Sequence, residues 1–147
     1  MGQGPGDATT GHLWAIDPDE CRRLLADAGV GRVCWQAGPG LTVLPVAYGV
    51  HDDGRLGFRA ADGSILAALA AAGPVDVAFE VDDLDAATLT GWSVLVRGSA
   101  TAWRGEFPAG LCRPWAPGER STGVQITPQS YSGRIVSGDD GQQGEGT

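Results

Sequence analysis

The feature that most constrains the fold is a two-residue period of apolar side chains that runs from residue 31 to residue 136. Side chains of a β-strand alternate between the two faces of a sheet, so this period predicts strands rather than helices. Turns rich in Gly, Pro and Asp separate the alternating segments, and Asp53-Gly54 is typical of a tight hairpin. The segments predicted as strands are 32–36, 41–50, 55–59, 75–81, 91–103 and 124–136. A bulge is predicted at Gly98, and the last segment is predicted to be broken at Pro128.

Two segments depart from this period and predict helices. In the first, Asp17 provides an N-cap, Glu20 is placed to complete a capping box, and Gly29 ends the segment as a C-terminal glycine. Apolar residues between them recur with helical spacing. The second is an Ala/Leu-rich segment that begins after Ser64 and ends at Gly73, which Pro74 follows.

Six strands, an N-terminal helix and a short crossover helix predict a mainly β fold, a small antiparallel barrel with helices at its mouth. The 147 residues, 42% of them apolar, are enough for one hydrophobic core. We expect a single domain over residues 12–137. Residues 1–11 and 138–147 are polar or Gly-rich and lack an apolar period, so both are predicted to be mobile tails.

Charge and cysteine content exclude several classes of protein. The net charge is −8, and the ten cationic residues are all arginines without a basic run, which argues against a nucleic acid or an anionic membrane as partner. No apolar run approaches the ~20 residues of a membrane span. Cys21, Cys34 and Cys112 are odd in number and widely spaced, so we expect reduced thiols in a cytoplasmic protein, without a disulfide or a zinc site.

One strand–turn–helix corner is a candidate anion site. The strand ends at Arg59, and the following helix begins after Gly63-Ser64. Free N–H groups and the positive end of the helix dipole would meet a fixed guanidinium there, an arrangement that binds anions. A guanidinium can hold one phosphate through two oxygens. The alternative is an ordinary corner with a surface arginine.

Other stretches bear on a site less directly. Pro45 lies in a predicted strand without an N–H to donate, so it lies at an edge, at a bulge, or where the ladder opens toward a ligand. Residues 105–121 form a Pro/Gly-rich loop anchored by Trp115, and loops of this length usually cover a site or meet a partner subunit. The acidic stretch 82–85 is expected to be a solvated turn, because the pattern of a calcium loop is missing. No metal site and no catalytic residue is predicted, so any chemistry would come from a bound cofactor.

Seven short segments are distributed, in order, over about four-fifths of the chain. They are Cys21-Arg-Arg-Leu-Leu-Ala26 with Gly29-Val-Gly-Arg32, Val43-Leu-Pro-Val-Ala-Tyr48, Leu56-Gly-Phe-Arg59 with Gly63-Ser64, Val77-Ala-Phe-Glu-Val-Asp82, Gly91-Trp-Ser-Val-Leu-Val-Arg-Gly98, Pro114-Trp-Ala-Pro-Gly118, and Val124-Gln-Ile-Thr-Pro128 with Gly133-Arg134. In this order the chain resembles the pyridoxamine 5′-phosphate oxidase-like family of flavin-binding split barrels, in its short actinobacterial form, although no single segment is specific.

The resemblance implies a six-stranded antiparallel split β-barrel that forms a homodimer, with FMN, or in some branches a deazaflavin, in a cleft between the subunits. Such enzymes pass a hydride through the flavin, so the resemblance implies a flavin-dependent oxidoreductase acting on an unidentified small molecule. The residues that it places in the site are Leu44, Pro45 and Val46 against the flavin ring, Arg59 and Ser64 at the phosphate, Trp92 and Ser93 near the ring, and Trp115 as a cap.

Three positions depart from the family pattern. Ala60 stands where the family usually has a threonine, Ile65 where it has a lysine, and Gln125 where it often has an arginine. A charge-assisted contact is worth roughly 1.5–3 kcal/mol, so the loss of one would weaken phosphate binding by about ten- to a hundred-fold.

These departures leave three hypotheses. The first is the flavin-dependent oxidoreductase, and the second is a cofactor-free or weakly flavin-binding dimeric split barrel that binds or converts an apolar small molecule. The third is a dimer-forming regulatory protein with no ligand.

Overall fold

The structure is a computed structural model that describes residues 12–138. The tails predicted at 1–11 and 138–147 lie outside these residues, apart from Gly138. The helices and strands, in chain order, are β1 (His12–Ile16), α2 (Pro18–Ala28), β2 (Val30–Ala37), β3 (Gly40–Ala47), β4 (Gly49–Val50), β5 (Leu56–Ala60), α3 (Ile65–Ala72), β6 (Val75–Asp85), β7 (Thr90–Ala102) and β8 (Thr122–Ser137).

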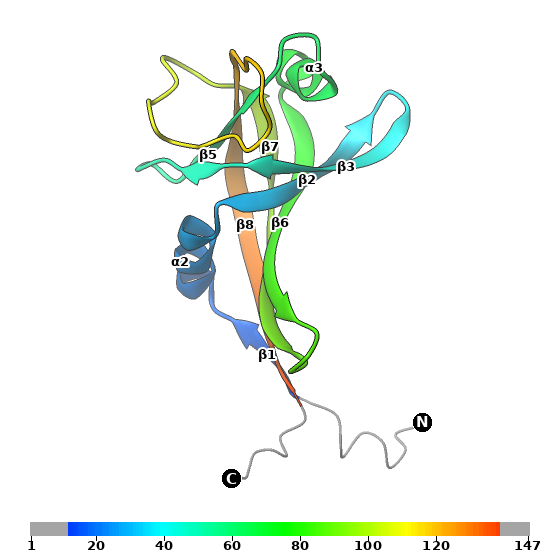
Figure 1. The fold of residues 1–147 in the computed structure, drawn as a ribbon, viewed down its shortest axis with the longest axis vertical. Coiled ribbons are helices and arrows are strands. Elements are labelled where there is room, and N and C mark those ends of the chain that lie inside the picture. Colours follow the sequence, from blue (N-terminus) through cyan, green and yellow to red (C-terminus); the bar gives the residue numbers. More distant parts are fainter. Residues whose placement is uncertain (1–11, 139–147) are drawn as a thin grey trace.

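The eight strands form one curled antiparallel sheet in the order β3-β2-β6-β7-β8-β5-β4, and β1 pairs with β8 (Figure 1). The long strand β8 pairs with two different strands along one of its edges. Its first part pairs with β5 and its last part pairs with β1. This arrangement confirms the predicted mainly β split barrel with two helices. The predicted strand 41–50 is divided at Tyr48 into β3 and β4, and β1 is an additional strand.

The sheet confirms two predicted details. Strand β3, which contains Pro45, is the edge of the sheet next to β2, so the missing N–H of the proline leaves no partner unsatisfied in the ladder. The register between β7 and β8 shifts between Arg97 and Gly98, which is the bulge predicted at Gly98.

Two expectations about the strands were wrong. The acidic stretch 82–85 is not a turn, because it extends β6 as far as the pair Asp85↔Thr90 with β7. Arg32 lies 3.2 Å from the Asp82 carboxylate, which offsets part of the charge repulsion along this strand. Strand β8 is continuous and is not broken at Pro128, since the bulge opposite Gly98 absorbs the irregularity.

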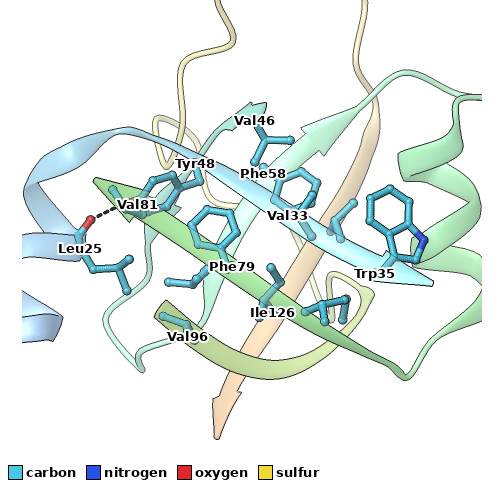
Figure 2. Packing of buried hydrophobic residues seen from close by; sticks show 14 of the residues in the cluster. Leu25, Val33, Trp35, Val46, Tyr48, Phe58, Phe79, Val81, Val96 and Ile126 are labelled. Atoms are coloured by element: carbon cyan, nitrogen blue, oxygen red, sulfur yellow. Dashed lines mark hydrogen bonds between the residues drawn. The ribbon is translucent and has the colours of Figure 1, made fainter. Parts of the chain in front are cut away.

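Helix α2 begins and ends where its caps predict. The Asp17 carboxylate accepts hydrogen bonds from the N–H groups of Asp19 and Glu20 at 2.8 and 3.2 Å, and Gly29 has a left-handed φ of 94°. The Glu20 carboxylate pairs with Arg23 instead of completing a capping box. The Tyr48 hydroxyl donates to the Leu25 carbonyl oxygen and ties this helix to the sheet (Figure 2).

The hydrophobic core lies inside the curl of the sheet (Figure 2). Side chains of β2, β5, β6, β7 and β8 fill it, and α2 and α3 each add apolar residues at one side. Burial of these side chains is the main source of stability for a domain of this size. The largest fully buried apolar side chains include Leu25, Val33, Leu56, Phe58, Phe79, Val81, Val94, Val96, Val124 and Ile126.

Candidate functional site

A cavity of about 300 Å³ opens where β3, β5, the start of α3 and the loop at residues 103–121 meet. In Figure 1 this region is the end of the molecule that carries α3. The walls are mainly apolar, and two arginines contribute to them. The residues that line the cavity are Val30, Pro45, Val46, Ala47, Arg59, Ala60, Ala61, Ser64, Leu66, Pro114, Trp115, Ala116 and Arg120.

The β5–α3 corner forms as predicted and faces this cavity. Phe58 and Ala60 are buried in the core, so the alternation of the strand turns Arg59 toward the cavity. The Ser64 hydroxyl oxygen accepts a hydrogen bond from the Ala67 N–H at 3.1 Å and caps α3. This bond satisfies the Ala67 N–H, and the Ser64 N–H bonds to the Ala61 carbonyl oxygen, so the N–H groups of Ile65 and Leu66 are those that remain available to an anion.

The Arg59 guanidinium is held by an aromatic ring of the loop. Its Cζ lies 4.6 Å from the centroid of the Phe107 ring, within the range of a cation–π interaction. None of the carboxylates in residues 12–138 forms an ion pair with Arg59 or with Arg120. Two unpaired guanidiniums beside one cavity favour an anionic ligand.

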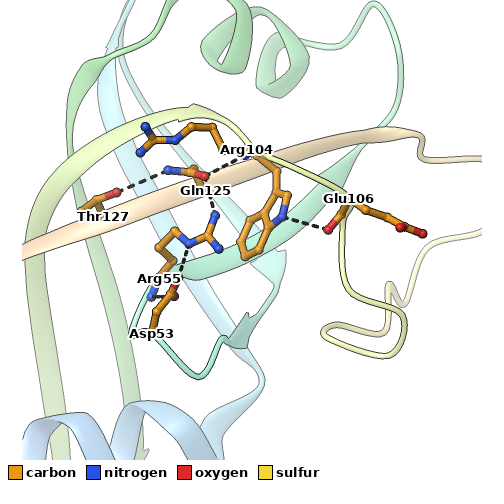
Figure 3. A network of polar contacts seen from close by, with 7 residues as sticks. Asp53, Arg55, Arg104, Glu106, Gln125 and Thr127 are labelled. Atoms are coloured by element: carbon orange, nitrogen blue, oxygen red, sulfur yellow. Dashed lines mark hydrogen bonds and ion pairs between the residues drawn. The ribbon is translucent and has the colours of Figure 1, made fainter.

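The loop at residues 103–121 is fixed at its first residues by a buried amide (Figure 3). The Gln125 Oε1 atom accepts hydrogen bonds at 2.9 Å from both the Arg55 Nη1 group and the Arg104 N–H. The Arg55 guanidinium also lies 4.0 Å above the Trp103 ring and pairs with Asp53 at 2.8 Å. Gln125 is therefore a structural residue at the base of the loop, and it does not line the cavity.

The end of the same loop is fixed to the β5–α3 corner. The Asp62 carboxylate accepts hydrogen bonds from the Thr122 hydroxyl at 2.7 Å and the Ser121 hydroxyl at 2.8 Å. These two donors hold the pKa of the Asp62 carboxyl below its usual range. Arg120 directly precedes Ser121, so this contact places Arg120 next to the corner that carries Arg59.

The candidate site residues are the eight that the resemblance assigns to the site and the two departures Ala60 and Ile65. Six of these ten line the cavity, namely Pro45, Val46, Arg59, Ala60, Ser64 and Trp115. The other four do not. Leu44 packs against the core, and Ile65 is 38% exposed on the outer side of the helix start.

Trp92 and Ser93 pair with Ile135 and Arg134 near the start of β7, at the end of the sheet away from α3 (Figure 1). Ser93 lines a second, separate groove with Trp14 and Arg134.

The sequence reasoning missed several lining residues. Val30 lies opposite Ala47 in the β2–β3 pair, and Pro114 and Ala116 flank Trp115 in the loop. Val30 was missed because β2 begins two residues before the predicted strand 32–36. Arg120 carried no local signal, because hydrogen bonds across about 60 residues of sequence set its position.

The cavity has no evident nucleophile or metal-binding group. Burial raises the pKa of the nearby Cys112 thiol, which keeps it protonated at neutral pH. Within residues 12–138 no cluster of three or more His, Cys, Asp or Glu side chains is arranged to hold a metal ion. In the same residues no helix is both long enough and apolar enough to cross a membrane. The arrangement can therefore bind an anionic group beside a flat apolar wall.

The fold and the cavity define a split-barrel protein with two arginines beside a cavity at one end of the barrel. A family model described as pyridoxamine 5′-phosphate oxidase matches residues 17–135, which is most of the chain. The chain belongs to this pyridoxamine 5′-phosphate oxidase family, as the resemblance in the sequence implied.

Individual relatives agree with this assignment. An uncharacterised protein of Mycobacterium tuberculosis, Rv0080, is 37% identical over 130 residues, which cover 83% of this chain and 85% of the relative. The structure of a FAD binding protein from Mycobacterium smegmatis is 29% identical, with a TM-score of 0.65 over 84% of this chain and 98% of that one. A FAD-binding protein from Mesorhizobium loti shares the fold at 22% identity, with a TM-score of 0.67 over 86% of this chain and 98% of that chain.

Proposed function

We propose that this protein binds a flavin nucleotide in the cavity between β3, α3 and the loop at residues 103–121. The observation that carries the proposal is the meeting of Arg59 and the free helix start of α3 with an apolar wall in one cavity. The corner suits a phosphate, and Pro45, Val46 and Leu66 suit a planar apolar ring. The Mycobacterium smegmatis relative, a FAD binding protein, supports the same class of ligand.

FMN is the flavin that we propose first, and FAD and a deazaflavin are the alternatives, because all three carry phosphate next to a flat ring system. A bound flavin would supply hydride transfer, which makes the protein a flavin-dependent oxidoreductase for a small molecule. The contribution of the chain itself is to bind and orient the cofactor. Arg59 and the helix start fix the phosphate end, and the strand β3 fixes the ring end.

We also propose that the site is completed in a homodimer. A cavity of about 300 Å³ is at the lower end of the range for small-molecule sites, and Trp115 is 82% exposed at its edge. Large apolar side chains are also exposed on β1 and β3, at Leu13, Trp14, Leu41 and Val43. A second copy would cover such surface and would bring its own groove, which is lined by Ser93, next to Trp92 in the chain, within reach of the flavin ring.

The mass in solution tests the dimer. We expect a dimer at micromolar concentration by light scattering. A monomer throughout that range would contradict the shared site.

The flavin proposal is tested by the absorbance of the purified protein and by titration with FMN and FAD. We expect blue absorbance that belongs to protein-bound flavin, or a saturable change on addition of flavin. Arg59→Gln is expected to weaken FMN binding by about ten- to a hundred-fold, because it removes a charge-assisted contact. Arg97→Gln, an exposed arginine on β7 away from the cavity, is the matched control and should bind like the wild type.

Two outcomes would contradict the flavin proposal. One is a colourless protein that shows no saturable response to FMN, FAD or a deazaflavin. The other is equal FMN affinity of Arg59→Gln and Arg97→Gln, which would show that the phosphate corner does not contribute to FMN binding. Oxidoreductase activity is tested separately, by anaerobic bleaching of the bound flavin with NADH or NADPH.

A cofactor-free site for an apolar small molecule is the second candidate. Two observations favour it: Ala60 and Ile65 supply neither the hydroxyl nor the ammonium group of the family pattern, and the cavity walls are mainly apolar. Native mass spectrometry discriminates between the two functions. A non-flavin adduct supports this candidate, whereas one flavin per subunit rules it out.

A further inference from the structure

A second arginine lies beside the same cavity as Arg59, on a different element of the fold. Arg120 belongs to the loop at residues 103–121, and it lines the cavity together with Arg59, Ser64 and Leu66. It is partly buried, and no carboxylate in residues 12–138 forms an ion pair with it. A cation without an internal counter-ion beside a cavity is placed for an anionic ligand.

The position of Arg120 is set by the fold. The two residues that follow it, Ser121 and Thr122, both donate hydroxyl hydrogen bonds to Asp62 in the β5–α3 turn. Thr122 also pairs with Ala60 as β8 begins beside β5. The backbone at Arg120 is therefore fixed against the same corner that presents Arg59 and the start of α3.

Charge balance at the corner indicates what Arg120 does. A phosphate monoester carries a charge between −1.5 and −2 at pH 7. Arg59 alone offsets about half of this charge, and Ile65 contributes none. Arg120 brings the number of cations beside the cavity to two.

We propose that Arg120 is the second cationic ligand of the flavin phosphate, supplied by the loop and positioned by the contact of Asp62 with Ser121 and Thr122. This inference rests on the proposed flavin site and names a residue of that site. The charge missing at Ile65 is thus provided from a distant part of the sequence. The loop becomes part of the cofactor site as well as its cover.

The test compares FMN with riboflavin, which has the same ring system but no phosphate. Fluorescence titrations are made with the wild type, with Arg120→Gln, and with Arg113→Gln as the control. Arg113 lies on the same loop, is exposed and does not line the cavity. We expect Arg120→Gln to weaken FMN binding by about ten- to a hundred-fold and to leave riboflavin binding within two-fold of the wild type. Arg113→Gln should change neither.

Three other outcomes would overturn the inference, each for a different reason. Equal FMN affinity of wild type and Arg120→Gln excludes Arg120 as a phosphate ligand while the flavin site itself stands. An equal loss for FMN and riboflavin shows that the substitution disturbs the loop rather than a phosphate contact. A wild type that binds neither FMN, FAD nor riboflavin rejects the flavin site, and Arg120 as its ligand with it. A thermal melt of each variant shows that it is folded.

Discussion

Tyr48 shows how one buried polar atom joins two parts of the fold. The side chain lies between β3 and β4, its ring meets that of Phe79 edge-on with centroids 4.9 Å apart, and its hydroxyl donates to the Leu25 carbonyl oxygen. Burial raises the pKa of Tyr48 far above its ordinary value, so the hydroxyl remains a donor at all ordinary pH values. The contact fixes the end of α2 against the sheet.

Tyr48→Phe removes only this hydroxyl. We expect the free energy of unfolding to fall by about 1–2 kcal/mol, because the Leu25 carbonyl oxygen near the helix end loses its buried donor. Urea denaturation measures the change. Tyr131→Phe is the matched control, since the Tyr131 ring lies half-buried beneath the Arg22 guanidinium, and it should change stability by less than about 0.5 kcal/mol. Equal losses for the two variants would show that the Tyr48 hydrogen bond contributes nothing of its own.

Some site residues are placed by local sequence patterns, and others are placed by contacts between segments that are distant in the sequence. Arg59 and Ser64 follow from local patterns, a strand alternation and a helix cap, and the sequence predicts both. Gln125, which stands where the family often has an arginine, lies at the base of the loop with Arg55 and Arg104. Its role and that of Arg120 depend on contacts between distant segments, which a period or a cap does not encode.

At the scale of elements, the loop at residues 103–121 determines the shape of the cavity. Gln125 fixes its start and Asp62 its end. Its middle packs closely on the sheet, because Leu111 lies over Gly49 and Gly57, two positions where a side chain would overlap it. A loop fixed at three points is ordered enough to present Trp115 and Arg120 to a ligand.

Gly49→Ala tests whether this close packing orders the loop. An added Cβ would overlap the Leu111 backbone, so the middle of the loop has to move away. We expect chymotrypsin to cut after Leu111 and Trp115, in the middle of the loop, several times faster than in the wild type, and FMN affinity to fall with it. Gly38→Ala, where an added Cβ meets nothing within 4 Å, should leave both unchanged. An intact loop in Gly49→Ala would contradict this account of the cavity.

The elements themselves were predicted unequally well. Both helices and most strands follow from caps, periods and turn residues, and they appear where these signals place them. Strand β1 was missed because only its pairing with residues 133–137, at the far end of the domain, makes it a strand. The stretch 82–85 was read as a turn because of its charge, whereas pairing with β7 and the nearby Arg32 keep it extended.

At the scale of the whole molecule, the residues that stabilise the fold and the residues that line the cavity lie in different parts of the structure. The fully buried side chains lie inside the curl, and the cavity lies at the end where α3 and the long loop meet the sheet (Figure 1). Arg59 belongs to the second region, because its guanidinium is only partly buried and packs on Phe107 outside the core cluster. A change there should therefore affect ligand binding more than folding.

Thermal unfolding with and without FMN measures, in one experiment, how Arg59→Gln affects folding and how it affects FMN binding. A ligand at a hundred times its Kd stabilises the folded state by about 2.7 kcal/mol, which for a chain of this size raises Tm by roughly 5–10 °C. Arg59→Gln should shift the unliganded Tm by no more than a few degrees, because it removes one partly buried cation–π contact outside the core. At the same FMN concentration its affinity loss leaves a ligand effect of only about 0.4–1.4 kcal/mol, so about half or more of the Tm increase should disappear. A full increase in Arg59→Gln would mean that the flavin binds away from the phosphate corner, and a large drop in the unliganded Tm would mean that the corner supports the fold itself.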